Sequence, residues 1–404
     1  MSAVAPASPE ALARFTTLQV GGPARRVVVA RTTDEVVETA LAAWADDEPL
    51  LVLGGGSNVV IGDDGFDGTV LVVATRGVEL LPAPAAGTAR PAPVDEADRL
   101  RLLERSLRPR QQRRTVRILV QAGEPWDDLC ALAAERGWSG IEALSGVPGS
   151  TGAAPIQNIG AYGQELAATL AAVRFLDRES GALRRLPASE LQLGYRTSAF
   201  KHGLEGVVTS VELDLHAATD GGPPLSAPVA YAQLADALGV PLGTRVPIAA
   251  LRDAVLALRR GKGMVLDDRD PESVSVGSFF TNPIVSERFA RTLPREAPRW
   301  PTTADEPDVV VPLGAALPPR PTRAGEPQVK LSAAWLIEHS GVHRGFRLPG
   351  SAAHVSSKHT LALVNGGGAT AGQVLELARY VRNLVQVEFG VLLQAEPDLV
   401  DARL

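Results

Sequence analysis

Residues 137–166 read GWSGIEALSGVPGSTGAAPIQNIGAYGQEL. Seven glycines alternate here with small residues and few charges, so the backbone can approach a neighbouring group closely. A flat cofactor with a pyrophosphate fits such a segment, because main-chain N–H and C=O groups can bind the phosphates and a ring edge. A buried irregular loop is the alternative, and it has to explain why Gln157, Asn158 and Tyr162 occur together among small residues.

The stretch GGGSN at residues 54–58 is a second glycine-rich motif and follows the apolar run PLLVL. Three successive glycines let backbone N–H groups turn toward an anion, and Ser57 and Asn58 add side-chain donors. The motif is not a Walker loop, since no Gly-Lys-Ser/Thr follows. It also fails the dinucleotide G-x-G-x-x-G pattern, since Val59 holds the last glycine's place. A phosphate cradle and a plain tight loop both stay open.

The segments before and after GGGSN predict a helix and several strands. Residues 32–47 open with a capping-box pattern of Thr32 and Glu35 and then have apolar residues at helical spacing. Residues 49–53 and 59–73 hold apolar, β-branched runs interrupted by turn residues, which is typical of strands.

Three elements further along the chain have clear periodicity. Residues 208–216, VTSVELDLH, alternate apolar and polar side chains and predict a half-buried strand with Ser210, Glu212 and Asp214 on its polar face. Two helices are predicted, each with an N-cap and a glycine stop: residues 329–341 with Ser332 and Gly341, and residues 370–389 with Thr370 and Gly390.

Length and composition indicate a multidomain protein without a membrane span. A chain of 404 residues is long enough for two or three cores, and a formal charge of -6 argues against a nucleic-acid partner. No run approaches the roughly 18 uncharged apolar residues of a membrane helix. The first residues lack the apolar region of a secretory signal, so a cytoplasmic location is expected. The single cysteine, Cys130, is expected to be a small core residue.

Two segments differ in composition from the rest. Residues 82–114 are rich in proline, alanine and arginine, and a solvated insertion is the favoured interpretation over a docking segment. Residues 294–328 hold nine prolines and predict an extended connection. The six histidines form no HExxH pattern and have no cysteine partners, so no metal site is expected.

Two short motifs hold polar residues that composition alone does not explain. LGYRTSAFK, residues 193–201, would place Arg196 and Ser198 on one face of a strand and Tyr195 on the other. SVGSFFTNP, residues 275–283, places Ser278 between a glycine and two phenylalanines. On local grounds alone, the arginine is a solvated surface residue and the serine a turn residue.

Taken together, the motifs LGGGSN, GVPGSTGAAPIQNIGAYG, GYRTSAFK, GSFFTNPIV and KLSAAWLIE, in this order, resemble the UDP-N-acetylenolpyruvoylglucosamine reductase (MurB) family of flavoenzymes. The resemblance runs from about Thr17 to Glu396. Its QNIGAYG and GSFFxNP elements are very specific, whereas the glycine triplet is not. The main departure from the family pattern is the insertion of residues 82–114.

The resemblance implies an α+β fold: a two-part FAD-binding domain of the vanillyl-alcohol-oxidase type (PCMH-like) and a smaller α+β substrate-binding domain. The expected divisions are residues 1–75 for the first FAD-binding part, 76–262 for the second, and 263–390 for the substrate domain. Residues 391–404 are expected to return to the first part. The sequence does not settle the oligomeric state, and a monomer is the default expectation.

The implied activity is NADPH-dependent reduction of UDP-N-acetylglucosamine enolpyruvate to UDP-N-acetylmuramate, in peptidoglycan precursor synthesis, by way of non-covalent FAD. With no separate nicotinamide fingerprint in the chain, NADPH and the sugar nucleotide are expected to use one pocket in turn. By motif position the FAD-binding residues are Gly54, Gly55, Gly56, Ser57, Asn58, Gly149, Ser150, Gly152, Ala153, Gln157, Asn158, Gly160, Ala161 and Tyr162.

The catalytic residues implied by motif position are Arg196, Ser278 and Glu396. Hydride addition leaves carbanion character beside the substrate carboxylate, which Arg196 and Glu396 would stabilise. Ser278 would deliver the proton that completes the new C–H bond. The implied substrate-binding residues are Tyr195, Tyr231, Lys262, Asn282 and His339.

Two alternatives to this function stay open on the sequence. One is an FAD-dependent sugar or alcohol oxidase of the same cofactor fold, which would need no GSFF serine and often anchors its flavin through histidine. The other is a UDP-sugar-binding flavoprotein without turnover, against which Arg196, Ser278 and Glu396 argue.

Overall fold

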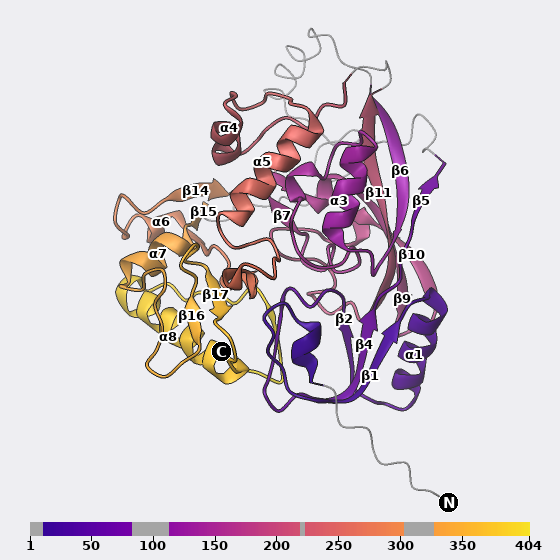
Figure 1. Cartoon of the computed structure of the whole chain (residues 1–404), viewed down its shortest axis with the longest axis horizontal. Helices are drawn as coiled ribbons and strands as arrows, with labels where there is room; N and C mark the ends of the chain where they lie inside the picture. Colours follow the sequence, from indigo (N-terminus) through magenta and orange to yellow (C-terminus); the bar gives the residue numbers. More distant parts are fainter. Residues whose placement is uncertain (1–10, 83–112, 219–222, 303–326) are drawn as a thin grey trace, which may run out of the picture.

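The computed structural model describes residues 11–82, 113–218, 223–302 and 327–404. Figure 1 shows a long sheet on one side, a small parallel sheet with one helix below it, and a C-terminal part on the opposite side. Residues 83–112 of the predicted insertion at 82–114 and residues 303–326 of the proline-rich stretch at 294–328 lie outside the described residues, as do the first ten residues of the chain. The last two residues of the predicted insertion, 113 and 114, belong to strand β6 (Arg113–Gln121). Within the described ranges, no helix has the length and apolar character needed to cross a membrane.

The N-terminal part is a parallel sheet covered by one helix. Its strands have the order β1-β4-β2, and α1 packs on it through Val36 and Ala40. The predicted capping box is confirmed, since the Thr32 side chain accepts from the amide of Glu35 and the Glu35 carboxylate accepts from the amide of Thr32. The elements are β1 (Ala24–Ala30), α1 (Thr33–Ala45), β2 (Leu50–Leu53), β3 (Val59–Ile61) and β4 (Phe66–Val73).

The second part is a five-stranded antiparallel sheet with the order β10-β9-β11-β6-β5. The prediction of a half-buried strand at 208–216 was partly wrong, because Ser210 and Glu212 are both buried. The strand lies in the middle of the sheet, and three hydrogen bonds from the Arg185 guanidinium compensate the buried Glu212 carboxylate. The strands are β5 (Val78–Leu81), β6 (Arg113–Gln121), β9 (Leu170–Asp177), β10 (Leu183–Pro187) and β11 (Gly206–Ala218).

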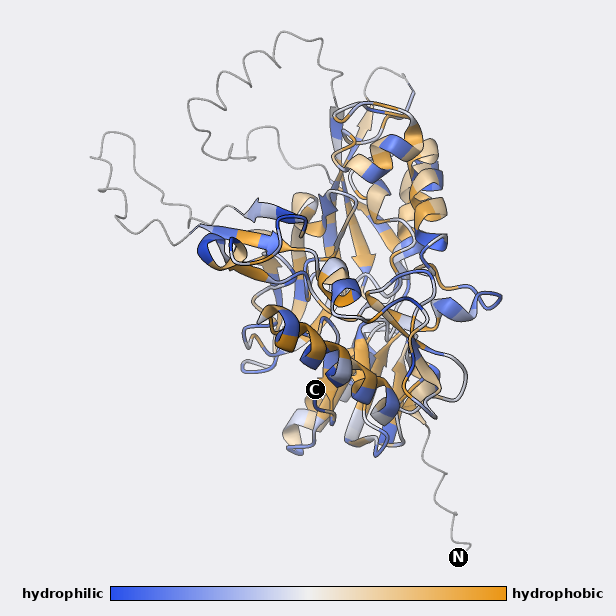
Figure 2. Cartoon of the chain, turned by 90° about the vertical axis from the view of Figure 1, so that its left-hand side faces the viewer, coloured by the Kyte–Doolittle hydropathy of each residue, from blue (hydrophilic) through white to orange (hydrophobic). Residues whose placement is uncertain are grey.

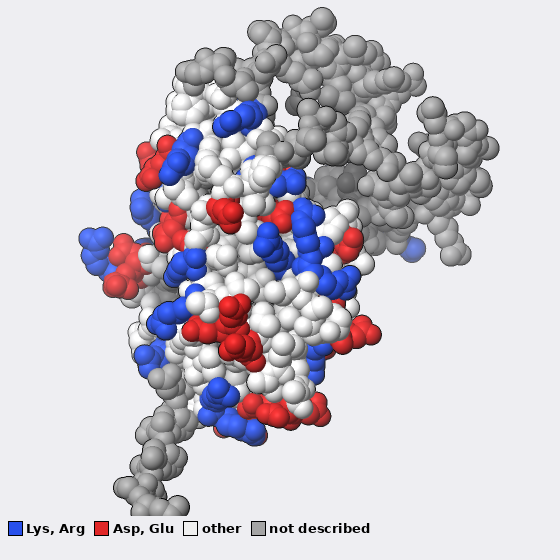
Figure 3. Space-filling view, turned by 90° about the vertical axis from the view of Figure 1, so that its right-hand side faces the viewer, with Lys and Arg blue, Asp and Glu red and all other residues white. Residues whose placement is uncertain are grey.

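Ion pairs cover the exposed face of this sheet. Arg117 pairs with Asp214 at 2.6 Å and Arg184 with Asp177 at 2.9 Å. Figure 3 shows Lys and Arg interspersed with Asp and Glu on the side of the molecule that carries α1 and the sheet edge. Mixed charge of this kind is typical of a solvated face.

Helix α3 packs on the large sheet, and α5 packs on α3 and α4, with a short hairpin nearby. Cys130 is 1% exposed on the first of these helices, as predicted, and its burial raises the pKa of the thiol. The elements are α3 (Trp126–Glu135), β7 (Gly160–Ala161), β8 (Gln164–Glu165), α4 (Ala232–Leu238) and α5 (Ile248–Arg260).

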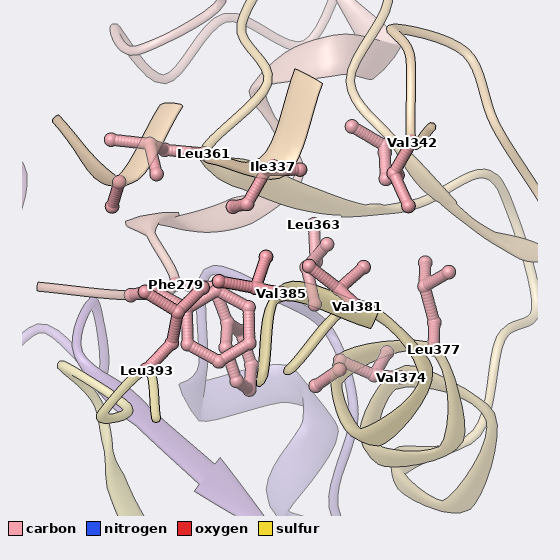
Figure 4. Packing of buried hydrophobic residues seen from close by; sticks show 14 of the residues in the cluster. Phe279, Ile337, Val342, Leu361, Leu363, Val374, Leu377, Val381, Val385 and Leu393 are labelled. Atoms are coloured by element: carbon pink, nitrogen blue, oxygen red, sulfur yellow. The ribbon is translucent and has the colours of Figure 1, made fainter. Parts of the chain in front are cut away.

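The C-terminal part packs two small antiparallel sheets, β12-β17-β16 and β13-β15-β14, with helices α6 to α8. Figure 4 shows Phe279 and Leu393 beside the apolar residues of α8, and Figure 2 shows hydrophobic and hydrophilic residues sharing that helix. The predicted caps Ser332, Thr370 and Gly390 are confirmed. The elements are β12 (Ser275–Ser278), β13 (Ile284–Ser286), α6 (Glu287–Ala290), β14 (Arg299–Thr302), β15 (Gln328–Leu331), α7 (Ala333–His339), β16 (Ala353–Val355), β17 (Ala362–Asn365) and α8 (Ala371–Phe389).

The last strand returns to the beginning of the chain. Strand β18 (Asp398–Val400) pairs in parallel with β3, with Leu399 opposite Val60. This pairing places the segment that contains Glu396 beside the end of GGGSN, because the amide of Asp398 donates to the carbonyl of Asn58 at 3.0 Å.

Three local predictions differ from the structure. The helix predicted over residues 329–341 begins only after Ser332, because residues 329–331 belong to strand β15. Residues 193–201 form a turn and not a strand, with Gly194 bridged to Thr197 and Arg196 at a φ of 55°. Arg196 and Ser198 therefore do not share a strand face. In the proline-rich stretch, residues 299–302 form β14, so the chain there is not only a connection.

Candidate active site

The small parallel sheet, the loops and helix ends of the second part, and the C-terminal part line a cavity of about 690 Å³. Both glycine-rich motifs, the turn at 193–201 and the strand β12 reach its wall. Most of the predicted site residues line it: Gly54, Gly55, Gly56, Ser57, Asn58, Gly149, Ser150, Ala153, Gln157, Gly160, Ala161, Tyr162, Tyr195, Arg196, Tyr231, Lys262, Ser278, Asn282 and Glu396.

The two glycine-rich motifs pack directly against each other. A Cβ on Gly55 would lie 2.7 Å from the Cα of Gly149, so only glycine permits this approach. Gly149 itself has a φ of 118°, and the Ser57 hydroxyl donates to the carbonyl of Pro148 at 3.0 Å. The loops that the sequence shows as separate motifs thus form one continuous wall.

This wall fits a bound pyrophosphate cofactor. Within the described part of the chain, the backbone N–H groups of residues 54–58 donate no hydrogen bond to the protein, although they line the cavity. Successive free N–H groups form a cradle for an anion. Trp126, Ile156 and Val276 add apolar surface to the same cavity, as a flat ring system requires.

Two predicted cofactor residues, Gly152 and Asn158, do not reach the cavity wall as the structure describes it. Gly152 packs against Ala122, and a Cβ added at Gly152 would lie 2.5 Å from the Cβ of Ala122. Asn158 is 1% exposed and its amide nitrogen donates to the carbonyl of Gly194 at 3.1 Å. Asn158 therefore holds the turn that carries Arg196.

The Arg196 guanidinium forms an ion pair with Glu396, with 3.0 Å between Nε and Oε1. It also donates to the carbonyl of Gly160 at 2.8 Å, which aims it across the cavity wall. Both side chains are mostly buried, with exposed fractions of 22% and 15%. Burial raises the pKa of Glu396, and Arg196 opposes that rise. The pair supplies a fixed cation beside a carboxyl group that is easier to protonate than usual.

Ser278 lies at the end of β12, next to the segment that carries Glu396. The following residue, Phe279, accepts a hydrogen bond from the amide of Glu396 at 2.9 Å, and Phe280 bridges to Ala395. Phe279 and Phe280 are 0% and 1% exposed, so they anchor the strand in the core. Backbone pairing therefore brings Ser278 and Glu396 together although 118 positions separate them in the printed sequence (396 − 278).

Aromatic and cationic side chains line the rest of the cavity. The Lys262 ammonium lies 5.6 Å from the Tyr162 ring centroid, and Tyr162 meets Tyr231 edge to face at 5.6 Å. Burial lowers the pKa of Lys262 and raises the pKa of Tyr162. The Lys330 ammonium lies 4.8 Å from the Tyr195 ring centroid.

The structure does not bring His339 to the cavity wall that it describes. The ring of His339 stacks on Trp335 at 3.8 Å, and its Nδ1 contacts the carbonyl of Trp335. A different histidine, His359, lines the cavity instead, as does Arg259. Sequence reasoning missed both, because neither stands in a motif and only the fold brings them to the site.

Groups of three or more His, Cys, Asp or Glu side chains that could hold a metal ion do not occur among the described residues. The prediction that the protein has no metal site stays a prediction.

Comparison with known proteins identifies the relationship. A family model described as the C-terminal domain of UDP-N-acetylenolpyruvoylglucosamine reductase matches residues 270–400, and a model described as an FAD binding domain matches residues 24–90 and 101–187. A UDP-N-acetylenolpyruvoylglucosamine reductase of Leifsonia xyli subsp. xyli is 53% identical over 97% of this chain and 98% of that relative. The chain belongs to the UDP-N-acetylenolpyruvoylglucosamine reductase family.

Other members of the family agree with this assignment. The reductase of Salinispora arenicola is 43% identical over 97% of this chain and 95% of that relative. The crystal structure of the reductase (MurB) from Thermus caldophilus is 24% identical, with a TM-score of 0.57 over 97% of this chain and 98% of that one, and shows the same fold. The α+β fold class, the FAD-binding domain and the oxidoreductase class are confirmed.

Proposed function

We propose that the chain reduces UDP-N-acetylglucosamine enolpyruvate to UDP-N-acetylmuramate, with NADPH as reductant, in peptidoglycan precursor synthesis. The observation that carries this proposal is the meeting of Arg196, Ser278 and Glu396 on the wall that the two glycine-rich loops also form. Bound FAD supplies hydride transfer from NADPH to the enolpyruvyl methylene. The N–H groups of residues 54–58 would hold its pyrophosphate.

In this proposal Arg196 and Glu396 stabilise the anionic state of the substrate. Hydride addition leaves charge on the substrate carboxylate, and the Arg196 guanidinium is already fixed by its bonds to Glu396 and Gly160. A preorganised cation in a site with little water stabilises such charge without reorganising. The raised pKa of Glu396 increases the fraction of neutral acid, which can donate a hydrogen bond to the same oxygens.

Ser278 is the proposed proton donor to the neighbouring carbon. Its position at the end of β12 is held by two buried phenylalanines and by the bond between Phe279 and the amide of Glu396. A hydroxyl is a weak acid, so it can serve only where the proton acceptor is strongly basic and held against it. A carbanion beside a carboxylate meets that condition.

Tyr195, Tyr231, Lys262 and Asn282 are the proposed contacts for the sugar nucleotide. Lys262 and Asn282 line the cavity and offer donors to the diphosphate, although Asn282 Oδ1 already accepts from the amide of Ala333 at 2.9 Å. Tyr231 is 45% exposed at the mouth beside Tyr162, where it can cover a bound substrate. His339 takes no part, because it packs on Trp335 outside the cavity.

We also propose the domain division and the location in the cell. The FAD-binding part comprises residues 1–75 and 76–262, with 391–404 returning to it, and residues 263–390 form the substrate domain; the pairing of β18 with β3 supports the return. NADPH and sugar nucleotides are cytoplasmic metabolites, which supports action in the cytoplasm.

The test uses the purified holoenzyme. We expect a flavin absorption spectrum, and oxidation of NADPH at a rate that rises strongly when UDP-N-acetylglucosamine enolpyruvate is added. A colourless protein that does not take up FAD, or NADPH oxidation that is indifferent to the sugar nucleotide, would contradict the proposal.

A further inference from the structure

One end of the cavity gathers cationic side chains around His359. Arg259, in the last turn of α5, is 8% exposed, and its Nε has no hydrogen-bond partner in the described residues. Its Nη2 donates to the carbonyl of Met264 at 2.8 Å, and Lys262 follows on the next turn of chain. A buried guanidinium with an unpaired N–H is costly unless an anion completes its hydrogen bonds.

His359 is held at this end by a rigid turn between β16 and β17. The Ser356 hydroxyl oxygen accepts from the amides of Lys358 and His359, at 3.1 and 3.3 Å. The same hydroxyl donates to a Glu272 carboxylate oxygen at 2.6 Å, and that carboxylate also accepts from the amide of Ser357. The imidazole therefore lines the cavity from a fixed backbone position.

The charged groups around His359 disfavour its protonation. Lys262 and Arg259 act on it from the end of α5 and Arg344 from the loop after α7, whereas Glu338 of α7 is the opposing carboxylate. Glu338 is already engaged by the Thr360 hydroxyl and, at 3.7 Å, by Arg344. Burial and the three cations lower the pKa of His359 to about 4, so the ring is neutral near pH 7.

We propose that His359 binds the anionic diphosphate of the sugar nucleotide and takes up one proton from solvent when the nucleotide binds. An arriving diphosphate offsets the positive charge of Arg259, Lys262 and Arg344, so the part of the suppressed protonation that these cations cause is removed. Its own negative charge then favours the protonated ring against burial, which is the largest cause of the lowered pKa. One imidazole nitrogen gains the proton, and no electron transfer accompanies it. The inference rests on the proposed function, because it takes a sugar nucleotide as the ligand.

The size of the effect follows from linkage. If the pKa of His359 in the complex returns to its ordinary value of about 6.5, the nucleotide binds about tenfold more tightly at pH 5.5 than at pH 8. At pH 6 about three-quarters of a proton is taken up for each nucleotide bound. The sign is fixed, since a pKa that is higher in the complex makes binding tighter as the pH falls.

The experiment is titration calorimetry of the FAD-loaded protein with UDP-N-acetylglucosamine, a probe that lacks the reacting enolpyruvyl group. Its diphosphate is esterified at both ends, so it does not itself titrate in this range. Measurement in two buffers of different ionisation enthalpy gives the number of protons taken up. His359→Gln keeps a neutral donor but cannot titrate, so we expect its affinity to be flat from pH 5.5 to 8 with no proton uptake.

His343→Gln is the matched control, because His343 is exposed on the loop after α7 and does not line the described cavity. It should keep the pH dependence and the proton uptake of the parent. Proton uptake that persists in His359→Gln, or binding to the parent without proton uptake, would overturn this inference alone. Failure of the probe to bind the parent at any pH would overturn the proposed function and this inference with it.

Discussion

Replacing Arg196 by methionine tests the centre of the proposed mechanism. The change keeps an unbranched apolar stem and removes the guanidinium, and with it the ion pair to Glu396 Oε1 at 3.0 Å and the hydrogen bond to the carbonyl of Gly160 at 2.8 Å. The Glu396 carboxylate, 15% exposed, is left without its cation. Breaking a buried pair in this way costs about 3 to 5 kcal/mol of folding free energy.

Arg196→Met should slow mainly the half-reaction in which the substrate reoxidises the flavin. Loss of a preorganised charge at a developing anion lowers the rate by about 10² to 10³, or about 3 to 4 kcal/mol. That anion forms only on the enolpyruvyl substrate, so Arg196→Met should slow flavin reoxidation by the substrate by this factor. Flavin reduction by NADPH should change by less than about tenfold.

The assay is stopped-flow absorbance of the flavin, with each half-reaction measured separately. Arg117→Met is the matched control, because Arg117 has the same 22% exposure and pairs with Asp214 at 2.6 Å, but it lies on the outer sheet face. The control should leave both half-reactions near the parent rates. Equal slowing of both half-reactions in Arg196→Met would refute the role given to Arg196.

Three further predictions test neighbouring parts of the site. Ser278→Ala should still let NADPH bleach the flavin while turnover falls by about 10² or more, and equal loss in flavin reduction and turnover would show that Ser278 is not the proton donor. Gly55→Ala places a Cβ 2.7 Å from Gly149 Cα, so we expect about 1 to 3 kcal/mol of strain and FAD binding weakened by about 10- to 100-fold in equilibrium dialysis; Gly261→Ala, whose Cβ meets nothing closer than 3.5 Å, should bind FAD like the parent. The folded-state pKa of Glu396 is raised above 4.5, so its contribution to stability is present below that pH and is lost as the pH rises through the folded pKa. Glu396→Gln should remove this loss when the free energy of unfolding of the apoprotein is measured in urea from pH 4 to 8. If the free energy of unfolding depends on pH in the same way for parent and variant, the raised pKa of Glu396 is contradicted.

Local patterns in the chain predicted most of the elements correctly. The capping box of α1, the caps of α7 and α8, and the strands around GGGSN depend on residues close in sequence, so their signals are readable without the fold. Residues 193–201 form a turn and not the strand considered from the sequence, and part of what holds this turn is distant: the Asn158 side chain, 36 residues away, donates to the carbonyl of Gly194.

The candidate site was predictable only where a motif marks it. Arg196, Ser278 and Glu396 carry no local signal of catalysis, and the family resemblance alone singled them out. His339 was predicted at the site but stacks on Trp335, whereas His359 lies in it. The choice between two histidines depends on which loop the tertiary fold turns toward the cavity.

The sequence by itself determined that the backbone of the two glycine-rich loops can approach a neighbouring group closely, because the missing Cβ of each glycine is known from the sequence alone. Only the tertiary structure decided that each loop is the other's neighbour, that Arg196 pairs with Glu396 across 200 positions (396 − 196), and that three cations surround His359. Ion pairing, burial and the pKa shifts that follow from them depend on distances between side chains, and strand pairing such as that of β18 with β3 sets those distances after the chain has folded.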